Sequence, residues 1–131
     1  MRVFLVEDQE HIRIRIRLAI EAIGACVVGE AATENYAVEC LLETAVDLVV
    51  VDLGLEEGSG IGVIRRLREK NPDVIIVVLS AVNRLMYERH CVEAGANYFM
   101  DKTLDFVRFV NLIKNLKHNY DIRTRFNNES Q

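Results

Sequence analysis

The sequence predicts an α/β fold: an open, doubly wound parallel sheet of five strands with helices on both faces. Short apolar runs rich in β-branched residues alternate along the chain with segments that have a helical pattern. Three of the runs are apolar without alternation, which is typical of strands that are buried on both faces of a parallel sheet. The connections between runs are about twenty residues long, enough for a crossover helix and too long for a hairpin.

The first connection is the most ambiguous part of this pattern. The expected strands are Arg2–Val6, Cys26–Gly29, Leu48–Val51, Val74–Leu79 and Asn97–Met100. After the first strand, Ile12–Leu18 alternates apolar and basic residues as a half-exposed strand does. On a helix, the same region gathers its apolar residues on one face: Ile12, Ile16, Ala19, Ile20 and Ile23. The βαβ context, and Gly24 placed where helices often end, favour the helix.

Capping residues and helix breakers place the second and third helices. Thr33 can cap a helix that runs to about Ala45. Ser59 can cap another helix that stops at Asn71-Pro72. Three arginines on the third helix are interpreted as its solvated face: Arg65, Arg66 and Arg68.

The last two helices complete a single domain. A fourth helix is expected over about Arg84–Ala94 and ends at Gly95. A fifth begins near Leu104, and its expected apolar stripe comprises Phe106, Val107, Phe109, Val110, Ile113 and Leu116. Beyond Asn119 the chain turns polar, and we expect it to fray. The predicted domain therefore covers residues 1–119, followed by a polar tail or the start of a linker over residues 120–131.

Composition sets limits on the class of protein. Half of the 131 residues are hydrophobic and 27% are charged, which argues against disorder. The net charge of −4 argues against binding nucleic acid through its phosphates. Three cysteines without a C-x-x-C spacing are expected to be buried free thiols in a reducing cytosol. The apolar runs are too short for a signal peptide or a membrane span, so we expect a soluble, cytoplasmic protein without membrane contact.

Polar side chains follow the expected strands, and the second strand is followed by Glu30, Ala31 and Ala32. Glu7 and Asp8 follow the first strand, Asp52 the third, Ser80 the fourth and Lys102 the fifth. Ligands of open α/β sheets bind outside the carboxyl ends of the strands, at the switch point of the strand order. Each of these residues alone is a common cap, turn or surface residue. Together they would bring three carboxylates, a hydroxyl and an ammonium group to one crevice.

This set of groups indicates metal-assisted phosphoryl chemistry. Three clustered carboxylates raise one another's pKa unless a cation neutralises them. Ligands that are all oxygen favour Mg²⁺ or Mn²⁺. A carboxylate beside such an ion, with a lysine and a hydroxyl opposite, is equipped to accept a phosphoryl group.

Six segments of the chain resemble those of response-regulator receiver domains of two-component signal transduction. They are Phe4–Asp8, Val28–Ala31, Asp47–Leu55, Gly58–Gly60, Val78–Ala81 and Ala94–Lys102, and they follow the order and spacing of that family. The resemblance covers about residues 1–118 and implies a flavodoxin-like (βα)5 fold with strand order 2-1-3-4-5, with which the strand pattern itself is compatible. It also implies a phosphorelay switch rather than an enzyme, with slow self-dephosphorylation.

The resemblance implies both partners and roles for single residues. The phosphodonor would be a sensor histidine kinase or a histidine phosphotransfer protein. The output would be a downstream protein target or an effector domain outside this sequence, without direct nucleic-acid binding by this chain. Asp52 resembles the phosphoacceptor, and Asp8 the residue that binds Mg²⁺ (or Mn²⁺) directly. Glu7 would act through metal-bound water, and Gly54 would offer its backbone carbonyl to the metal.

A second group of matching residues corresponds to the family's switch. Lys102 would pair with the phosphoryl oxygens, and Ser80 would hydrogen-bond the phosphoryl group once it arrives. Ala81 is small, as phosphoryl access requires, and Phe99 stands at the switch-aromatic position. Because Phe99 has no hydroxyl group, any switching that involves it must work through packing.

Three positions depart from the family pattern. Glu7 replaces the commoner aspartate, which still allows metal binding. Glu56 stands where many members carry proline, so we expect a more mobile loop after Asp52. Thr103 stands where many members carry a cis-bonded proline after the lysine.

Three other functional classes remain to be weighed. A metal-dependent phosphatase with an aspartate nucleophile would typically carry a second acid two residues after the nucleophile, where this chain has Gly54. A flavin- or nucleotide-binding module would need a phosphate-binding loop after the first strand, where Glu7 and Asp8 have the wrong charge. A receiver that is never phosphorylated is disfavoured by the full set of acidic residues with Ser80 and Lys102.

The outer face of the first helix is a candidate docking surface. At about 100° per residue, Ile14 and Leu18 fall off the core arc of this helix, one turn apart. The helix begins beside Glu7 and Asp8, so a partner bound there could present its histidine to Asp52. The family likeness points to the same helix, and burial of Leu18 under neighbouring helices is the alternative.

Overall fold

Five parallel strands form one sheet in the computed structural model, which describes residues 1–81, 84–102 and 105–129. The strands are β1 (Arg2–Val6), β2 (Cys26–Ala31), β3 (Leu48–Val51), β4 (Ile75–Ser80) and β5 (Tyr98–Asp101). Their order in the sheet is β2-β1-β3-β4-β5. The predicted fold class and strand order are confirmed.

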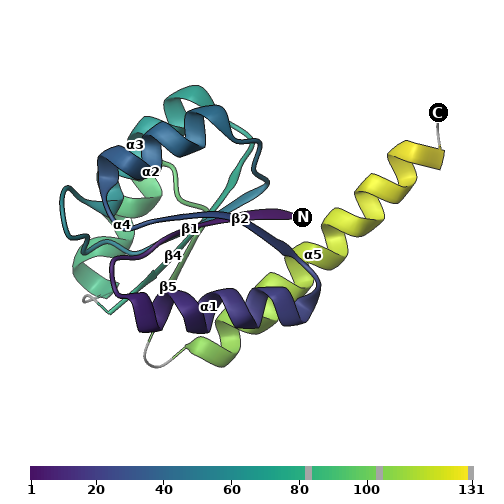
Figure 1. The fold of residues 1–131 in the computed structure, drawn as a ribbon, viewed down its shortest axis with the longest axis horizontal. Coiled ribbons are helices and arrows are strands. Elements are labelled where there is room, and N and C mark those ends of the chain that lie inside the picture. Colours follow the sequence, from purple (N-terminus) through teal and green to yellow (C-terminus); the bar gives the residue numbers. More distant parts are fainter. Residues whose placement is uncertain (82–83, 103–104, 130–131) are drawn as a thin grey trace.

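Helices cover both faces of the sheet. They are α1 (Glu10–Ile23), α2 (Glu34–Glu43), α3 (Gly60–Lys70), α4 (Arg84–Ala94) and α5 (Phe106–Glu129). Figure 1 shows α1 and α5 on one face and α2, α3 and α4 on the other. The ambiguous segment Ile12–Leu18 lies within α1, so the βαβ context predicted it correctly.

The predicted capping residues end or begin their helices as expected. Gly24 follows α1 with a φ of 96°, a left-handed conformation that glycine adopts without strain. Thr33 accepts a hydrogen bond from the Tyr36 N–H at 3.3 Å, and Ser59 accepts one from the Gly62 N–H at 3.0 Å. Apart from the carboxyl end of α5, element ends lie within two residues of the sequence prediction, which is the usual uncertainty of helix and strand boundaries.

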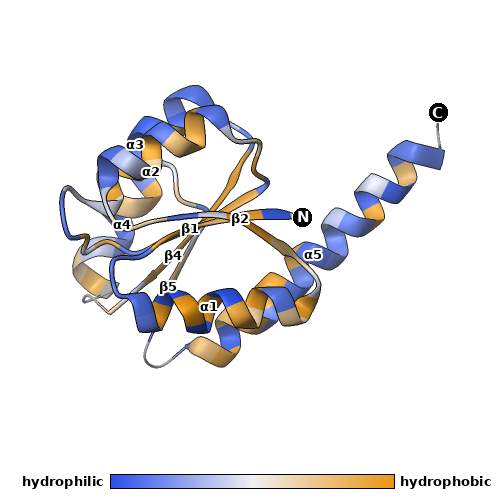
Figure 2. Ribbon diagram, in the orientation of Figure 1, coloured by the Kyte–Doolittle hydropathy of each residue, from blue (hydrophilic) through white to orange (hydrophobic). Residues whose placement is uncertain are grey.

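Side chains of the strands divide the core into two clusters. Phe4 and Val6 of β1 belong to the cluster beneath α2, α3 and α4, which we name the upper core. Val3 and Leu5 belong to the cluster beneath α1 and α5, which we name the lower core. Because successive residues of a strand point to opposite faces, both faces of β1 must be apolar. Figure 2 shows apolar residues on the strands and on the inward sides of the helices.

The faces of α1 and α5 decide several sequence predictions. Ile16 and Ile20 of α1 are buried, while Ile14 is 36% exposed and Leu18 is 58% exposed, so neighbouring helices do not cover Leu18. On α5, Ile113 is buried as predicted. Val107 is 73% exposed, and its assignment to the apolar stripe was wrong. Val107 lies about 100° around the helix from Phe106, outside the arc that faces the sheet.

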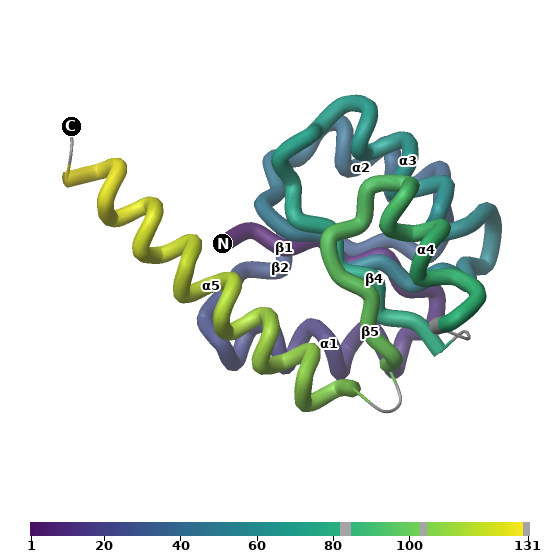
Figure 3. Tube along the Cα trace, turned by 180° about the vertical axis from the view of Figure 1, so that it is seen from behind, coloured from purple at the N-terminus to yellow at the C-terminus, as the bar shows by residue number. Residues whose placement is uncertain are grey.

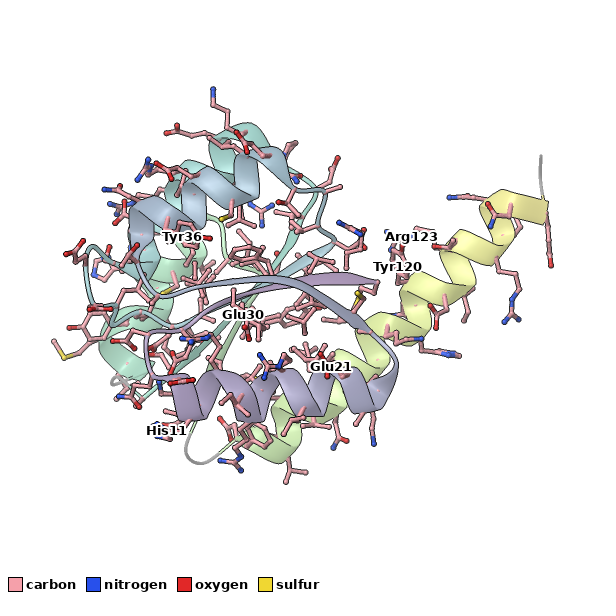
Figure 4. All side chains as sticks on the ribbon, viewed as in Figure 1. His11, Glu21, Glu30, Tyr36, Tyr120 and Arg123 are labelled. Atoms are coloured by element: carbon pink, nitrogen blue, oxygen red, sulfur yellow. The ribbon has the colours of Figure 1, made fainter. Side chains whose placement is uncertain are left out.

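The second half of α5 projects from the sheet (Figure 3). We expected the chain to fray beyond Asn119, but the helix continues to Glu129. An ion pair one turn apart, Lys117 Nζ to Asp121 Oδ2 at 2.6 Å, supports this part of the helix. A groove of about 560 Å³ separates it from the amino ends of the strands, and Tyr120 and Arg123 line that groove (Figure 4).

Arg68 corrects the interpretation of α3 as a helix with a solvated arginine face. Its guanidinium is half-buried and donates hydrogen bonds to five acceptors: the carbonyl oxygens of Asn71, Pro72, Val74 and Gly95, and Oδ1 of Asn97. The distances lie between 2.7 and 3.1 Å. Arg68 therefore ties the end of α3 to the start of β4 and to the turn before β5. Arg65 and Arg66 are exposed, as predicted.

Two expectations about composition can be compared with the structure. All three cysteines are free, as predicted, but Cys26 is exposed and only Cys91 is buried. Across residues 1–81, 84–102 and 105–129, no helix has both the length and the apolar character that crossing a bilayer requires.

Candidate functional site

The acidic residues meet at the carboxyl edge of the sheet because β1 and β3 are neighbours. Val6 and Val51 are register partners at the ends of these strands. The Asp52 N–H donates to the carbonyl of Val6 at 2.9 Å, and the Glu7 N–H donates to the carbonyl of Ala31 at 2.9 Å. One carboxylate oxygen from each of Glu7, Asp8 and Asp52 lies within 4.8 Å of the others.

Burial gives Glu7 unusual acid–base behaviour. Glu7 is 2% exposed and Asp52 is 6% exposed, whereas Asp8 is half-buried. Desolvation raises the pKa of Glu7 from 4.5 to about 8, and its hydrogen bond with Asp52 acts in the same direction. Lys102 opposes this shift. The crevice therefore favours the protonated form of Glu7, or a cation beside its carboxylate.

Lys102 supplies a positive charge beside both buried acids. Its Nζ lies 3.0 Å from Oε1 of Glu7 and 3.3 Å from Oδ2 of Asp52. Burial alone would lower the pKa of Lys102, but its contacts with Glu7 and Asp52 raise the pKa above the usual value. The Lys102 N–H donates to the carbonyl of Ser80 at 3.1 Å, which fixes the backbone from which the ammonium reaches.

Two further predicted residues lie on the neighbouring strands β4 and β5. Ser80 ends β4 and is fully buried, and Ala81 after it is exposed. Phe99 of β5 is 5% exposed, packs in the upper core, and is the register partner of Val78. Ser80 and Phe99 therefore occupy adjacent strands, two register positions apart. The prediction about Thr103 falls on a residue outside the described part of the chain.

The loop that follows Asp52 brings Gly54 to the exposed side of the site. Gly54 forms an isolated antiparallel bridge with Ser59. At the end of this loop, a Cβ atom at Gly60 would overlap the backbone carbonyl oxygen of Asp52. Glycine is thus required at position 60 for α3 to begin against the backbone of Asp52, a role that the sequence alone did not reveal.

Arg13 is another site residue that the sequence interpretation missed. Its Nη1 donates to the backbone carbonyl of Glu7 at 2.8 Å. Its Nε also lies 4.0 Å from Oε1 of Glu30. Arg13 belongs to the alternating segment of α1, where its basic side chain carried no signal beyond an exposed face.

The groups at the carboxyl edge are of the types that bind a divalent cation. The three carboxylates lie close enough together to offer the oxygen ligands that Mg²⁺ prefers. The ammonium group of Lys102 lies beside Glu7 and Asp52, and Ser80 ends the neighbouring strand β4. The charge and the donor types therefore fit a divalent cation of this kind.

A family model described as the response regulator receiver domain matches residues 3–114. The chain belongs to this family. The receiver is 31% identical over 109 residues to chemotaxis protein CheY of Thermotoga maritima, which covers 83% of this chain and 91% of that protein. It is 27% identical over 120 residues to the DNA-binding transcriptional activator EvgA of Escherichia coli, covering 92% of this chain and 59% of EvgA.

The length of the relatives differs from that of this receiver. A relative from Pseudomonas aeruginosa is 33% identical over 101 residues, and the match covers 77% of this chain and 49% of that protein. The chain thus spans about half the length of that relative, and nearly all of CheY.

Solved structures agree with the family assignment. A LuxR-family two-component response regulator from an Aurantimonas species superposes with a TM-score of 0.82 at 31% identity, covering 88% of this chain and 83% of that chain. The response regulator domain of Thermotoga maritima CheB superposes with a TM-score of 0.79 at 22% identity, covering 90% and 94%. The prediction of a receiver domain of two-component response regulators is confirmed, and the alternative of an aspartate-nucleophile phosphatase finds no support.

Proposed function

We propose that this receiver accepts a phosphoryl group on Asp52 from the phosphohistidine of a sensor histidine kinase or a histidine phosphotransfer protein. The observation that carries the proposal is the buried Asp52 carboxylate at the end of the central strand, 3.3 Å from the Lys102 ammonium. A carboxylate oxygen of Asp52 would attack phosphorus as the phosphorus–nitrogen bond breaks. The electron pair of that bond would return to the imidazole nitrogen. The product on Asp52 is an acyl phosphate.

The residues around Asp52 suit this transfer in charge. Lys102 would pair with the phosphoryl oxygens and offset their negative charge. Mg²⁺ (or Mn²⁺), when bound, would supply further positive charge at the same oxygens. Asp8, Asp52 and the Gly54 carbonyl would hold the metal directly, and Glu7 would hold it through a water molecule. The proximity of the three carboxylates supports this assignment.

The same site would reverse the modification and report it. Attack of a water molecule on phosphorus would release phosphate and restore the Asp52 carboxylate, and this self-dephosphorylation would be slow. Exposed Ala81 leaves access to the site, and Ser80 at the end of β4 would hydrogen-bond the phosphoryl group. Phe99, buried on the adjacent strand, would then repack, which is a population shift between two core arrangements.

The phosphodonor would dock on the outer face of α1. Ile14 and Leu18 are exposed there, one helical turn apart. The helix begins at Glu10, directly after the acidic pair, so a helix packed on Ile14 would have its histidine within reach of Asp52. The residues that bind the partner are thereby separate from those that perform the chemistry.

The test is phosphorylation by a small donor. We would incubate the protein with acetyl phosphate and Mg²⁺ and measure the intact mass, with beryllofluoride binding by fluorine NMR as a second readout. We expect one added phosphoryl group, no addition to Asp52→Asn, and no addition in the presence of a chelator. Asp73→Asn is the matched control, because Asp73 is exposed at the opposite end of the strands. Equal modification of wild type and Asp52→Asn would refute the proposal.

A further inference from the structure

The loop between β3 and α3 depends on the position of Ser59. This loop, residues 53–59, carries the Gly54 carbonyl that the proposed function assigns to the metal. Its ends are joined where the Gly60 N–H donates to the carbonyl of Leu53 at 3.0 Å. Within it, Gly54 pairs with Ser59 through the isolated bridge. The place of Gly54 therefore follows from the place of Ser59.

Ser59 is held from another element, by Glu34 at the start of α2. Oε1 of Glu34 accepts the Ser59 N–H at 2.9 Å, a contact across 25 positions of sequence. The backbone N–H of Glu34 donates to the carbonyl of Glu57 at 3.0 Å. The carboxylate also lies beside Gly62 in the first turn of α3, where the helix dipole favours negative charge. Glu34 thus contacts the loop at two points.

The Glu34 carboxylate is itself restrained. Its Oε2 lies 3.2 Å from Nη1 of Arg66, which also donates to Oδ1 of Asn35 at 2.9 Å. The Glu34 side chain is 20% exposed. Two glycines make room for it: a Cβ at Gly58 would overlap the Glu34 Cβ, and a Cβ at Gly62 would overlap Oε1 and Cδ. Residues from α2, the loop and α3 thus enclose one carboxylate.

We propose that Glu34 is a positioning residue for the metal-binding loop. By holding the Ser59 N–H, it fixes the Gly54 carbonyl through the Gly54–Ser59 bridge. The inference rests on the proposed function, because it assigns the Gly54 carbonyl to the metal. The loop that contains Glu56 is thus restrained by a contact from α2.

Magnesium affinity and amide exchange of the full chain test the proposal. We would measure the Mg²⁺ dissociation constant by calorimetry, and hydrogen exchange of the Ser59 amide by NMR without metal. Glu34→Ala should weaken Mg²⁺ binding by about two- to tenfold, the factor that corresponds to one lost hydrogen bond. The same variant should speed exchange at Ser59. Glu34→Gln keeps an acceptor oxygen for Ser59 and should retain most of the affinity, and Arg66→Ala should have a smaller effect than Glu34→Ala.

Gly62→Ala separates positioning from general stability. Alanine favours a helix over glycine, so this change supports α3 while its Cβ displaces the end of the Glu34 side chain. We expect weaker Mg²⁺ binding without a matching loss of stability to urea. In the Glu34→Ala background the side chain that a Cβ at position 62 would overlap is absent. Gly62→Ala should then raise stability and leave Mg²⁺ affinity unchanged. A purely structural role for Glu34 would instead lower stability alone.

The outcomes distinguish this inference from the proposed function. If Asp52→Asn abolishes Mg²⁺ binding while Glu34→Ala and Gly62→Ala bind Mg²⁺ as the wild type does, the positioning role is wrong and the proposed function stands. Equal losses in Glu34→Gln and Glu34→Ala would also overturn it, because the Ser59 contact would then not be the cause. If the wild type does not bind Mg²⁺, the proposed function fails and the inference fails with it.

Discussion

Replacing Arg68 should destabilise this receiver more than any other arginine of α3. Its guanidinium connects three segments that are distant in sequence: the end of α3, the start of β4 and the turn before β5. Three of its acceptors are partly buried carbonyls, those of Asn71, Val74 and Gly95. In Arg68→Ala, these carbonyls lose a charged donor that water replaces incompletely.

The magnitude follows from those three carbonyls. The bonds to Pro72 and Asn97 are exposed, so water can take over from Arg68 there. Assigning about 1 kcal/mol to each partly buried carbonyl gives a loss of about 3 kcal/mol in the free energy of unfolding. For a domain of this size, that loss corresponds to a fall of roughly 10 °C in the melting temperature. The stability of Arg68→Lys should lie between those of the wild type and Arg68→Ala, because one ammonium group cannot reach acceptors on several sides.

Urea unfolding followed by circular dichroism measures this effect. We expect a lower midpoint with an unchanged slope, since the surface exposed on unfolding stays the same. Arg65→Ala is the control, because Arg65 lies exposed on the same helix, and it should change stability by no more than about 0.5 kcal/mol. If Arg68→Ala is as stable as Arg65→Ala, the hydrogen bonds of Arg68 do not contribute as argued.

The remaining predictions concern the site and its surface. Burial raises the pKa of Glu7 from 4.5 to about 8. As the pH rises, Glu7 therefore loses its proton at a lower pH in the unfolded protein than in the metal-free folded protein. The free energy of unfolding of the metal-free protein should therefore fall as the pH rises from about 5 to about 8. Urea unfolding that does not depend on pH, or that depends on pH in the same way in Glu7→Gln, would contradict this prediction. Lys102→Ala should still bind Mg²⁺ in calorimetry, but its conformational change on phosphorylation should be impaired. Side-chain NMR of Phe99 should change when beryllofluoride binds, and an unchanged spectrum would mean that the signal leaves by another route. Ile14→Asp should lose phosphoryl transfer from the cognate kinase and keep phosphoryl transfer from acetyl phosphate. Retention of both reactions would exclude the α1 surface as the docking site of the kinase.

The strands and their order were predictable because strands buried on both faces have apolar runs without alternation. Each residue of β3 packs into one of the two cores, so the strand must be apolar throughout. The end of α5 was less predictable. Its polar composition indicated a frayed tail, but a helix satisfies its backbone hydrogen bonds internally and continues without a core to pack on.

Side-chain contacts between distant elements were beyond the reach of the sequence. Arg66 and Arg68 are two residues apart on α3, yet Arg66 is exposed beside Glu34 and Arg68 is half-buried among carbonyls. Nothing in their local pattern separates them, because their partners lie up to 32 residues away. The meeting of Glu7, Asp52 and Lys102 was easier to predict, since the carboxyl ends of the strands converge at one edge of a sheet of this order.

The projection of α5 gives this receiver a lever. The helix has 24 residues, and Ile113 is its last fully buried side chain, so about 24 Å of helix extends beyond that pivot. A tilt of about 10° at Ile113 would move the far end by roughly 4 Å. The helix itself begins at Phe106, four residues after Lys102, the residue that would meet the phosphoryl group. A rearrangement too small to resolve around Lys102 would therefore be measurable as a displacement at Glu129.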